Sequence, residues 1–135
     1  LAPYAASSGI RDSMVWQSER GVKVQWTAMG EGCTDLKAFT SEWQRLCPKL
    51  PMQLETISGF AKEFPFLDED FWPPYSNVSA RDFSRFLLLS HKGNEIPPFS
   101  SSKILDRKKD QQQYQLSELE KSLKYCKQVL GVGIS

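Results

Sequence analysis

The segment that most limits the fold of this chain is residues 51–59, Pro-Met-Gln-Leu-Glu-Thr-Ile-Ser-Gly. A proline precedes its apolar positions and a glycine follows them, so the segment has the length and the punctuation of a single strand. We therefore predict a buried strand with Glu55 near its carboxyl end. Parallel α/β folds place their chemistry at such strand ends, which makes Glu55 the first functional candidate. A strand-end glutamate that only meets solvent or a backbone amide is the alternative interpretation.

A shorter strand and a hairpin are predicted before this segment. Residues 4–10 are small and weakly apolar, which favours a short buried strand that delivers Arg11 and Asp12 to its end. The runs 14–16 and 22–28 flank a turn, and the second run alternates apolar with polar residues. This pattern predicts a β-hairpin carried on a long loop.

Three helices are predicted around these strands. The first spans residues 36–47, with Asp35 as its N-cap and its aromatic residues in the core. The second begins at a capping box that runs from Ser79 to Asp82, and it ends at Gly93. The third is amphipathic and is expected to dock through apolar residues at an alternating three-four spacing: Leu116, Leu119, Leu123, Cys126 and Leu130.

Two further features bear on function. Residues 60–75 combine many aromatic residues, prolines and acids without a period, which favours an ordered loop that packs over the site or forms a partner surface. His91 is the single histidine of the chain and falls in the last turn of the second predicted helix. A solvated side chain is the expected state of a histidine at that position.

Composition and charge disfavour several classes of function. The chain has 135 residues, of which 40% are hydrophobic and 24% are charged, as in an ordinary small globular domain. Seventeen Lys and Arg residues against sixteen Asp and Glu residues give a net charge of +1. No overall field therefore attracts nucleic acid, a membrane surface or an acidic substrate.

Cysteine usage and hydropathy indicate the cytoplasm. Cys33, Cys47 and Cys126 form no Cys-x-x-Cys pattern, which argues against a disulfide framework and against a structural zinc site. No apolar run approaches the ~20 residues of a membrane span, and the amino-terminal residues show no signal pattern. Because the first residue is Leu1 and not methionine, we expect the chain to be a fragment.

Several short motifs are informative through their order and spacing. Within residues 10–55 they are Ile10-Arg11-Asp12-Ser13, Val24-Gln25-Trp26, Gly30-Glu31-Gly32-x-x-Asp35, Leu46-Cys47-Pro48 and Gln53-Leu54-Glu55. Further along they are Phe71-Trp72, Phe83-x-x-Phe86 and Ser122-x-x-Tyr125-Cys126-x-x-x-Leu130-Gly131. Together they resemble the carboxyl-terminal part of the xylose isomerase-like TIM barrels known as sugar phosphate isomerases/epimerases.

The resemblance implies a fold that this chain cannot complete alone. The predicted order of strand, hairpin, helix, strand, helix and helix is α/β, but two long strands cannot close a sheet. A complete (β/α)8 barrel needs about 250 residues. Residues 1–94 would then hold the last two β/α units with the hairpin as a loop insertion. Residues 95–110 would be a linker, and residues 111–135 a helix that docks on the barrel.

The resemblance also implies a chemistry. Members of this family hold a divalent metal ion at the carboxyl-terminal mouth of the barrel through carboxylates and a histidine, and they move a proton between adjacent carbons of a carbohydrate. Glu55 matches the carboxylate of the last strand, so it is the candidate catalytic residue and metal ligand. The residue types do not distinguish Mn, Mg, Co or Zn as the metal.

Three residues are candidates for binding the carbohydrate substrate. Arg11 and Asp12 follow the first predicted strand, and Arg20 could reach in from the hairpin turn. A structural salt bridge is an equally open role for each of them. Gly9 stands where many members of the family carry a histidine ligand, so this chain departs from the family pattern at that strand.

Three functional interpretations remain. The first is a metal-dependent sugar (phosphate) isomerase or epimerase that is incomplete, and inactive, as this chain alone. The second is a non-catalytic fragment or interaction module whose apolar faces pair with another copy or with a missing amino-terminal barrel half. A nuclease of the same architecture is disfavoured, because one histidine and a neutral charge supply neither several metal-binding histidines nor a phosphate-attracting surface.

Overall fold

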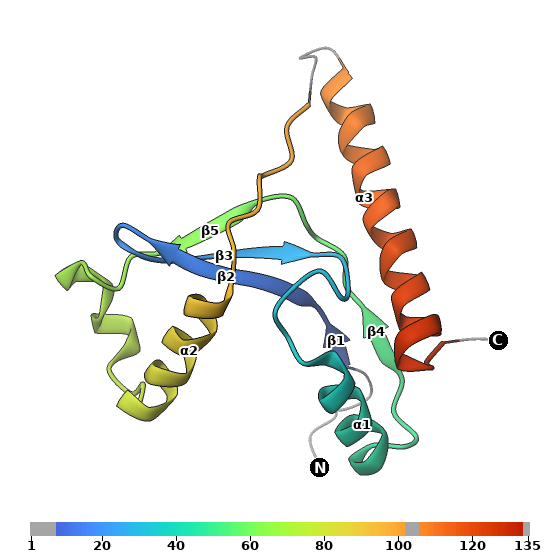
Figure 1. Cartoon of the computed structure of the whole chain (residues 1–135), viewed down its shortest axis with the longest axis horizontal. Helices are drawn as coiled ribbons and strands as arrows, with labels where there is room; N and C mark the ends of the chain where they lie inside the picture. Colours follow the sequence, from blue (N-terminus) through green and yellow to red (C-terminus); the bar gives the residue numbers. More distant parts are fainter. Residues whose placement is uncertain (1–7, 102–105, 134–135) are drawn as a thin grey trace.

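A short parallel pair of strands lies at one end of a computed structural model that describes residues 8–101 and 106–133 (Figure 1). Strand β1 (Ser8–Ile10) pairs in parallel with β4 (Met52–Leu54), and Gly9 lies opposite Gln53. The strand predicted after Pro51 is therefore present. Its apolar side chains are only half-buried, because β1 is the single partner of β4 in the described residues. Residues 4–7 of the predicted first strand lie outside the described part.

The second sheet is antiparallel and has the strand order β2-β3-β5. Strands β2 (Asp12–Ser18) and β3 (Gly21–Thr27) form the predicted hairpin, and a single residue, Arg11, separates it from β1. Strand β5 (Ala61–Phe64) pairs with β3, although we predicted an irregular loop there. Pairing with β3, in which Val22 lies opposite Phe64, orders this four-residue strand, which its own sequence does not predict. The described residues are thus a mixed α/β arrangement without a closed barrel.

Helix α1 (Leu36–Leu46) connects the hairpin to β4 and begins as predicted. The Asp35 carboxylate accepts a hydrogen bond from the Ala38 N–H at 3.0 Å, which satisfies one free donor of the first turn. Only Leu36 and Thr40 of this helix are buried. The prediction that its aromatic residues lie in the core is wrong, because Phe39 stays 43% exposed.

Helix α2 (Ala80–Lys92) packs on the hairpin strand β2. It also contacts the aromatic-rich residues 66–75, which we call the aromatic lobe. Ser79 caps the helix by accepting the Asp82 N–H at 3.1 Å, as predicted. The lobe contains two short helices, η2 (Glu69–Phe71) and η3 (Pro73–Tyr75). The Trp72 ring meets Phe83 of α2 at 5.2 Å, so the predicted aromatic loop is ordered by contact with this helix.

Helix α3 (Arg107–Tyr125) runs along the opposite side of the molecule (Figure 1) and continues as a π-helical turn, η5 (Cys126–Leu130). It begins at Arg107, inside the segment expected to be a linker to residue 110. The prediction that its apolar face docks inward is confirmed only at the end of that face, where Cys126 and Leu130 pack against the buried cluster of Ile10, Met29 and Leu36. Glu118 and Ser122 are the buried residues of the helix, whereas Leu116 and Leu123 are 56% and 53% exposed.

The packed interior is small for the length of the chain. One buried cluster consists of Ile10, Met29 and Leu36, with Tyr125 and Leu130 packed against it. The chain has an accessible surface of 10076 Å², whereas a folded monomer of 15.4 kDa has about 7200 Å².

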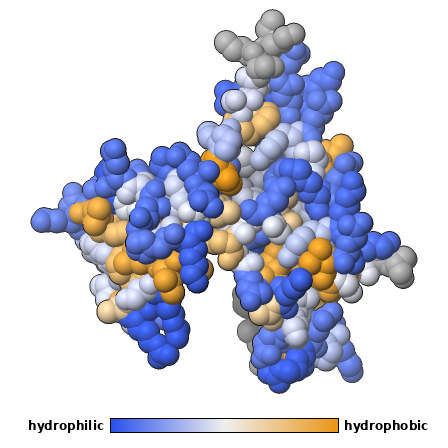
Figure 2. Space-filling model, viewed as in Figure 1, coloured by the Kyte–Doolittle hydropathy of each residue, from blue (hydrophilic) through white to orange (hydrophobic). Residues whose placement is uncertain are grey.

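Figure 2 shows apolar patches over the α2 lobe and near the lower part of α3. Within residues 8–101 and 106–133, no helix has the length and apolar character that crossing a membrane requires.

Candidate functional site

Arg11 and Glu55 meet at the carboxyl ends of the parallel strands. Each residue directly follows its strand, and the Glu55 N–H donates to the Ile10 carbonyl at 3.0 Å, which extends the pairing by one step. The Arg11 guanidinium forms an ion pair with the Glu55 carboxylate. The two side chains are 39% and 43% exposed. The structure therefore brings two of the predicted site residues together, at an edge that a small molecule can reach.

Gly9 faces the Glu55 carboxylate across the strand pair. A Cβ atom added at Gly9 would overlap the Glu55 carboxylate group. A side chain at this position would therefore point at the same carboxylate. This is the position at which the resemblance predicts a histidine, so the departure from the family pattern lies directly beside the candidate catalytic residue.

Two aromatic rings extend this edge away from Arg11. The Arg11 guanidinium carbon lies 5.9 Å from the centre of the Trp26 ring, within the range of a cation–π contact. The Trp26 ring in turn lies 5.4 Å from the Phe60 ring. Trp26 belongs to one of the motifs, but no sequence pattern singled out Phe60 as a site residue.

The Asp12 side chain is buried, and both of its carboxylate oxygens accept hydrogen bonds from backbone N–H groups. Its Oδ1 accepts the N–H groups of Ser13 at 2.8 Å and Thr34 at 3.4 Å, and its Oδ2 accepts those of Gly30 and Gly32, both at 2.9 Å. The residue is 1% exposed. Asp12 therefore holds the loop that leads into α1, and its oxygens have no free position for a substrate.

Arg20 lies away from the strand ends. It occupies the β2–β3 turn, which Figure 1 shows at the far end of the hairpin from β1 and β4. Its guanidinium pairs with Asp68 and lies 4.0 Å from Glu63. The hydrogen bond to Asp68 raises the pKa of Arg20 above its ordinary value. In this structure Arg20 joins the hairpin turn to the aromatic lobe and does not reach Glu55.

Glu55 and its neighbours form an incomplete set of ligands for the predicted divalent metal ion. Glu55 offers hard carboxylate oxygens, as Mg²⁺ or Mn²⁺ prefers, but the Arg11 cation already binds them. No group of three or more His, Cys, Asp or Glu side chains within residues 8–101 and 106–133 could hold a metal ion. These residues do not form a metal centre by themselves, and the metal stays a prediction that needs ligands from elsewhere.

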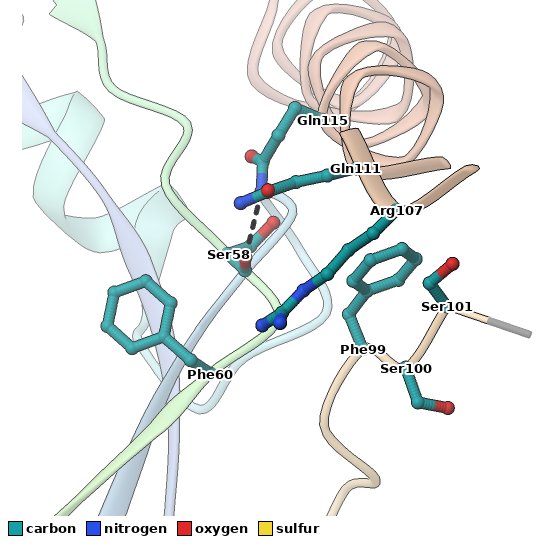
Figure 3. Close-up of a pocket in the computed structure, with 9 residues that line it drawn as sticks. Ser58, Phe60, Phe99, Ser100, Ser101, Arg107, Gln111 and Gln115 are labelled. Carbon is teal, nitrogen blue, oxygen red and sulfur yellow. Dashed lines mark hydrogen bonds between the residues drawn. The ribbon is translucent and has the colours of Figure 1, made fainter. Parts of the chain in front are cut away.

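A cavity of about 420 Å³ opens beyond Phe60. It lies between the segment after β4, the segment after α2 and the first half of α3 (Figure 3). Ser58, Arg107 and Gln115 are among the residues that line it. No sequence pattern indicates these residues, because they come from three distant segments and show no common spacing.

Comparison with known proteins adds no assignment. No family model matches the chain, and neither a curated protein nor a solved structure matches it.

Proposed function

We propose that this chain supplies an acid–base edge of a sugar (phosphate) isomerase or epimerase. The observation that carries the proposal is the pairing of Arg11 with Glu55 directly after two adjacent parallel strands. Parallel α/β enzymes gather their reacting groups at this edge, and both side chains are accessible there.

The finer fold assignment belongs to the same proposal. Strand β1, helix α1 and strand β4 make a unit in which a helix connects two adjacent parallel strands, with the hairpin inserted before the helix. Closed (β/α)8 barrels are built from such units. We infer that these are the last two β/α units of a barrel whose other strands this chain does not contain.

Glu55 is the base of the proposed reaction. Its carboxylate accepts the proton from the carbon next to the carbonyl of an open-chain sugar, and the electron pair of the C–H bond forms the C=C bond of an enediolate. The carbonyl oxygen takes the negative charge. For isomerisation, the hydroxyl proton on the deprotonated carbon moves to the former carbonyl oxygen, protonated Glu55 gives its proton to the former carbonyl carbon, and the deprotonated carbon becomes the new carbonyl. For epimerisation, the intermediate must turn its opposite face to Glu55, or a second acid must protonate the carbon from that face.

Arg11 is the group that accommodates the negative charge. In the free state its guanidinium neutralises Glu55. A substrate oxygen that becomes anionic beside Glu55 can share this cation through one of its remaining N–H donors. The guanidinium has five donors in a planar fork, so it can hold a carboxylate and an oxyanion together. The predicted metal ion would polarise the same carbonyl, but no step here depends on it.

The proposal is tested by Glu55→Gln in the longest reading frame that contains this chain. Gln keeps the side-chain volume but removes the proton acceptor, so turnover should fall by about two to four powers of ten with the protein still folded. The measurements are aldose–ketose interconversion, epimer exchange and deuterium incorporation at the reacting carbon, each with and without added Mn²⁺ or Mg²⁺. Thermal unfolding is followed alongside.

The matched control is Glu42→Gln on α1. Glu42 also pairs with an arginine, Arg45, on the surface, but far from the strand ends in the fold. Its replacement should leave turnover unchanged. The proposal fails if Glu55→Gln turns over at the parental rate, or if it loses activity only because it has unfolded.

An interaction module is the second candidate function. It is favoured by an accessible surface about 2900 Å² above that of a typical monomer of this mass, and by exposed apolar side chains on α1 and α3. The 135-residue chain should then self-associate or bind ANS as a partly molten state. A compact monomer with cooperative unfolding, seen by sedimentation and urea titration, would rule this candidate out.

A further inference from the structure

The face that α3 turns toward the molecule carries polar side chains along most of its length, together with Tyr114, which stacks on Phe99, and Tyr125, which packs against the buried cluster. Arg107, Gln111 and Gln115 stand four residues apart and therefore lie on one side of the helix, which continues into buried Glu118 and Ser122. Figure 3 shows the first three side chains extending from α3 into the cavity. A helix that only covers a core turns its leucines inward, whereas this helix leaves Leu116 and Leu123 exposed. The inward face has the composition of a binding-site wall.

Two buried polar atoms at this wall lack a hydrogen-bond partner of normal geometry. Ser58 is 4% exposed, and its hydroxyl has no such partner in the described part of the chain. Gln115 donates its Nε2 to the Ser58 carbonyl at 2.9 Å, but its Oε1 accepts nothing there. Burial raises the pKa of the nearby Tyr114, and its interaction with Ser58 opposes that rise in part. The Ser58 and Gln115 side chains therefore belong to a polar wall of the cavity.

Arg107 gives the cavity its charge. Of the described residues that line the cavity, Arg107 alone carries a charge, and its guanidinium points between the Phe60 and Phe99 rings in Figure 3. No carboxylate of residues 8–101 or 106–133 forms an ion pair with it. A guanidinium without a counter-charge, in a cavity of ligand size, is suited to a phosphate or a carboxylate.

The cavity is connected to the proposed acid–base edge by aromatic rings. Phe60 lines the cavity and contacts Trp26, and Trp26 lies beneath Arg11, the partner of Glu55. A carbohydrate can lie along such rings with its C–H faces against them.

We propose that this cavity binds the anionic end of a polyhydroxylated substrate, with a phosphate or a carboxylate on Arg107 and hydroxyl groups along the polar wall to which Gln111 and Gln115 belong. The proposal rests on the proposed function for the position of the reacting carbons. The binding of the anion itself is independent of turnover.

The test is calorimetric titration of the same full reading frame with glucose 6-phosphate, gluconate and glucose, and with inorganic phosphate. The two anionic sugars should bind more tightly than glucose, and a preference between them identifies phosphate or carboxylate as the group that is recognised. Arg107→Gln should weaken binding of the preferred anionic sugar about tenfold or more, and Arg107→Lys should restore part of the loss. Glucose should bind both variants equally.

The matched control is Lys108→Gln, which removes one positive charge from the neighbouring residue outside the cavity and should leave binding unchanged. Circular dichroism checks that each variant keeps its helix content. Equal affinity for glucose and both anions, or an unchanged affinity in Arg107→Gln, would overturn the inference. The parent protein separates the two proposals: anion binding that depends on Arg107, in a parent that shows neither isomerisation nor epimerisation, would support the cavity and reject the enzyme.

Discussion

Two carboxylates follow the ends of the parallel strands, and their surroundings differ in almost every respect. Asp12 is 1% exposed and accepts four backbone N–H groups. The Glu55 side chain is 43% exposed, and a long, flexible arginine is its partner. Backbone donors at Asp12 cannot leave without unfolding a loop, whereas Arg11 can shift when a ligand arrives. Two acids at one sheet edge therefore divide into a structural group and a reactive one.

The largest expected effect on stability is that of Asp12→Asn. The amide keeps one acceptor oxygen but turns an NH₂ group toward backbone donors, and it removes the negative charge on which four hydrogen bonds converge. We expect the free energy of unfolding to fall by about 3 kcal/mol. Urea titration followed by tryptophan fluorescence measures this loss.

Glu55→Gln is the natural control for that experiment. Because Glu55 is exposed and forms one ion pair, its replacement should cost less than about 1 kcal/mol in the free energy of unfolding. Equal losses in the two variants would contradict the division between a structural and a reactive carboxylate.

The strand ends were also the part of the molecule that the sequence predicted best. Proline and glycine punctuation located the strand before Glu55, and the capping residues Asp35 and Ser79 located two helix starts. These signals are local, so they hold whatever surrounds them. The neighbourhood of Arg11 and Glu55 follows from one further rule, that adjacent parallel strands end at the same edge.

The roles of Asp12 and of α3 could not be predicted in the same way. The four donors to Asp12 include loop residues up to 22 positions away, which no pattern around Asp12 reveals. On α3 the leucine spacing correctly indicated a helix, but periodicity does not tell which face meets the rest of the protein. The Ser122 hydroxyl accepts the Met29 N–H at 3.0 Å, and this hydrogen bond holds the polar face of α3 toward the rest of the protein.

A third carboxylate, Glu118, is buried like Asp12 but pairs with a side chain that titrates. It is 3% exposed like Asp12, but its partner is a cation, Lys121, whose Nζ lies 3.0 Å from one of its oxygens and 3.2 Å from Glu31. The hydrogen bond to Glu118, followed by the contact with Glu31, raises the pKa of Lys121. Backbone amides do not titrate at alkaline pH, whereas Lys121 does, so the ion pair of Lys121 with Glu118 should be lost at high pH.

The sign of the effect follows from the raised pKa. The stability that Lys121 contributes is fully present below its unfolded pKa of about 10.4 and is lost as the pH rises through the folded value. Because Lys121 is half exposed, the loss should stay below about 1 kcal/mol. Urea titrations of the parent and of Lys121→Met at pH 8 and pH 11 isolate it. An equal pH dependence in both proteins would contradict the role of this pair.

We expect the smallest effect from His91→Gln, which tests whether the reacting groups lie at the ends of β1 and β4. His91 is exposed in the last turn of α2, and its ring nitrogen lies 3.4 Å from the Gln17 amide nitrogen. Gln can keep that polar contact, so the free energy of unfolding should change by less than about 0.5 kcal/mol. Turnover in the assay used for Glu55→Gln should also stay at the parental level. A histidine is the commonest acid–base residue, so a loss of turnover in His91→Gln without a loss of stability would mean that the reacting groups lie on the α2 lobe and not at the ends of β1 and β4.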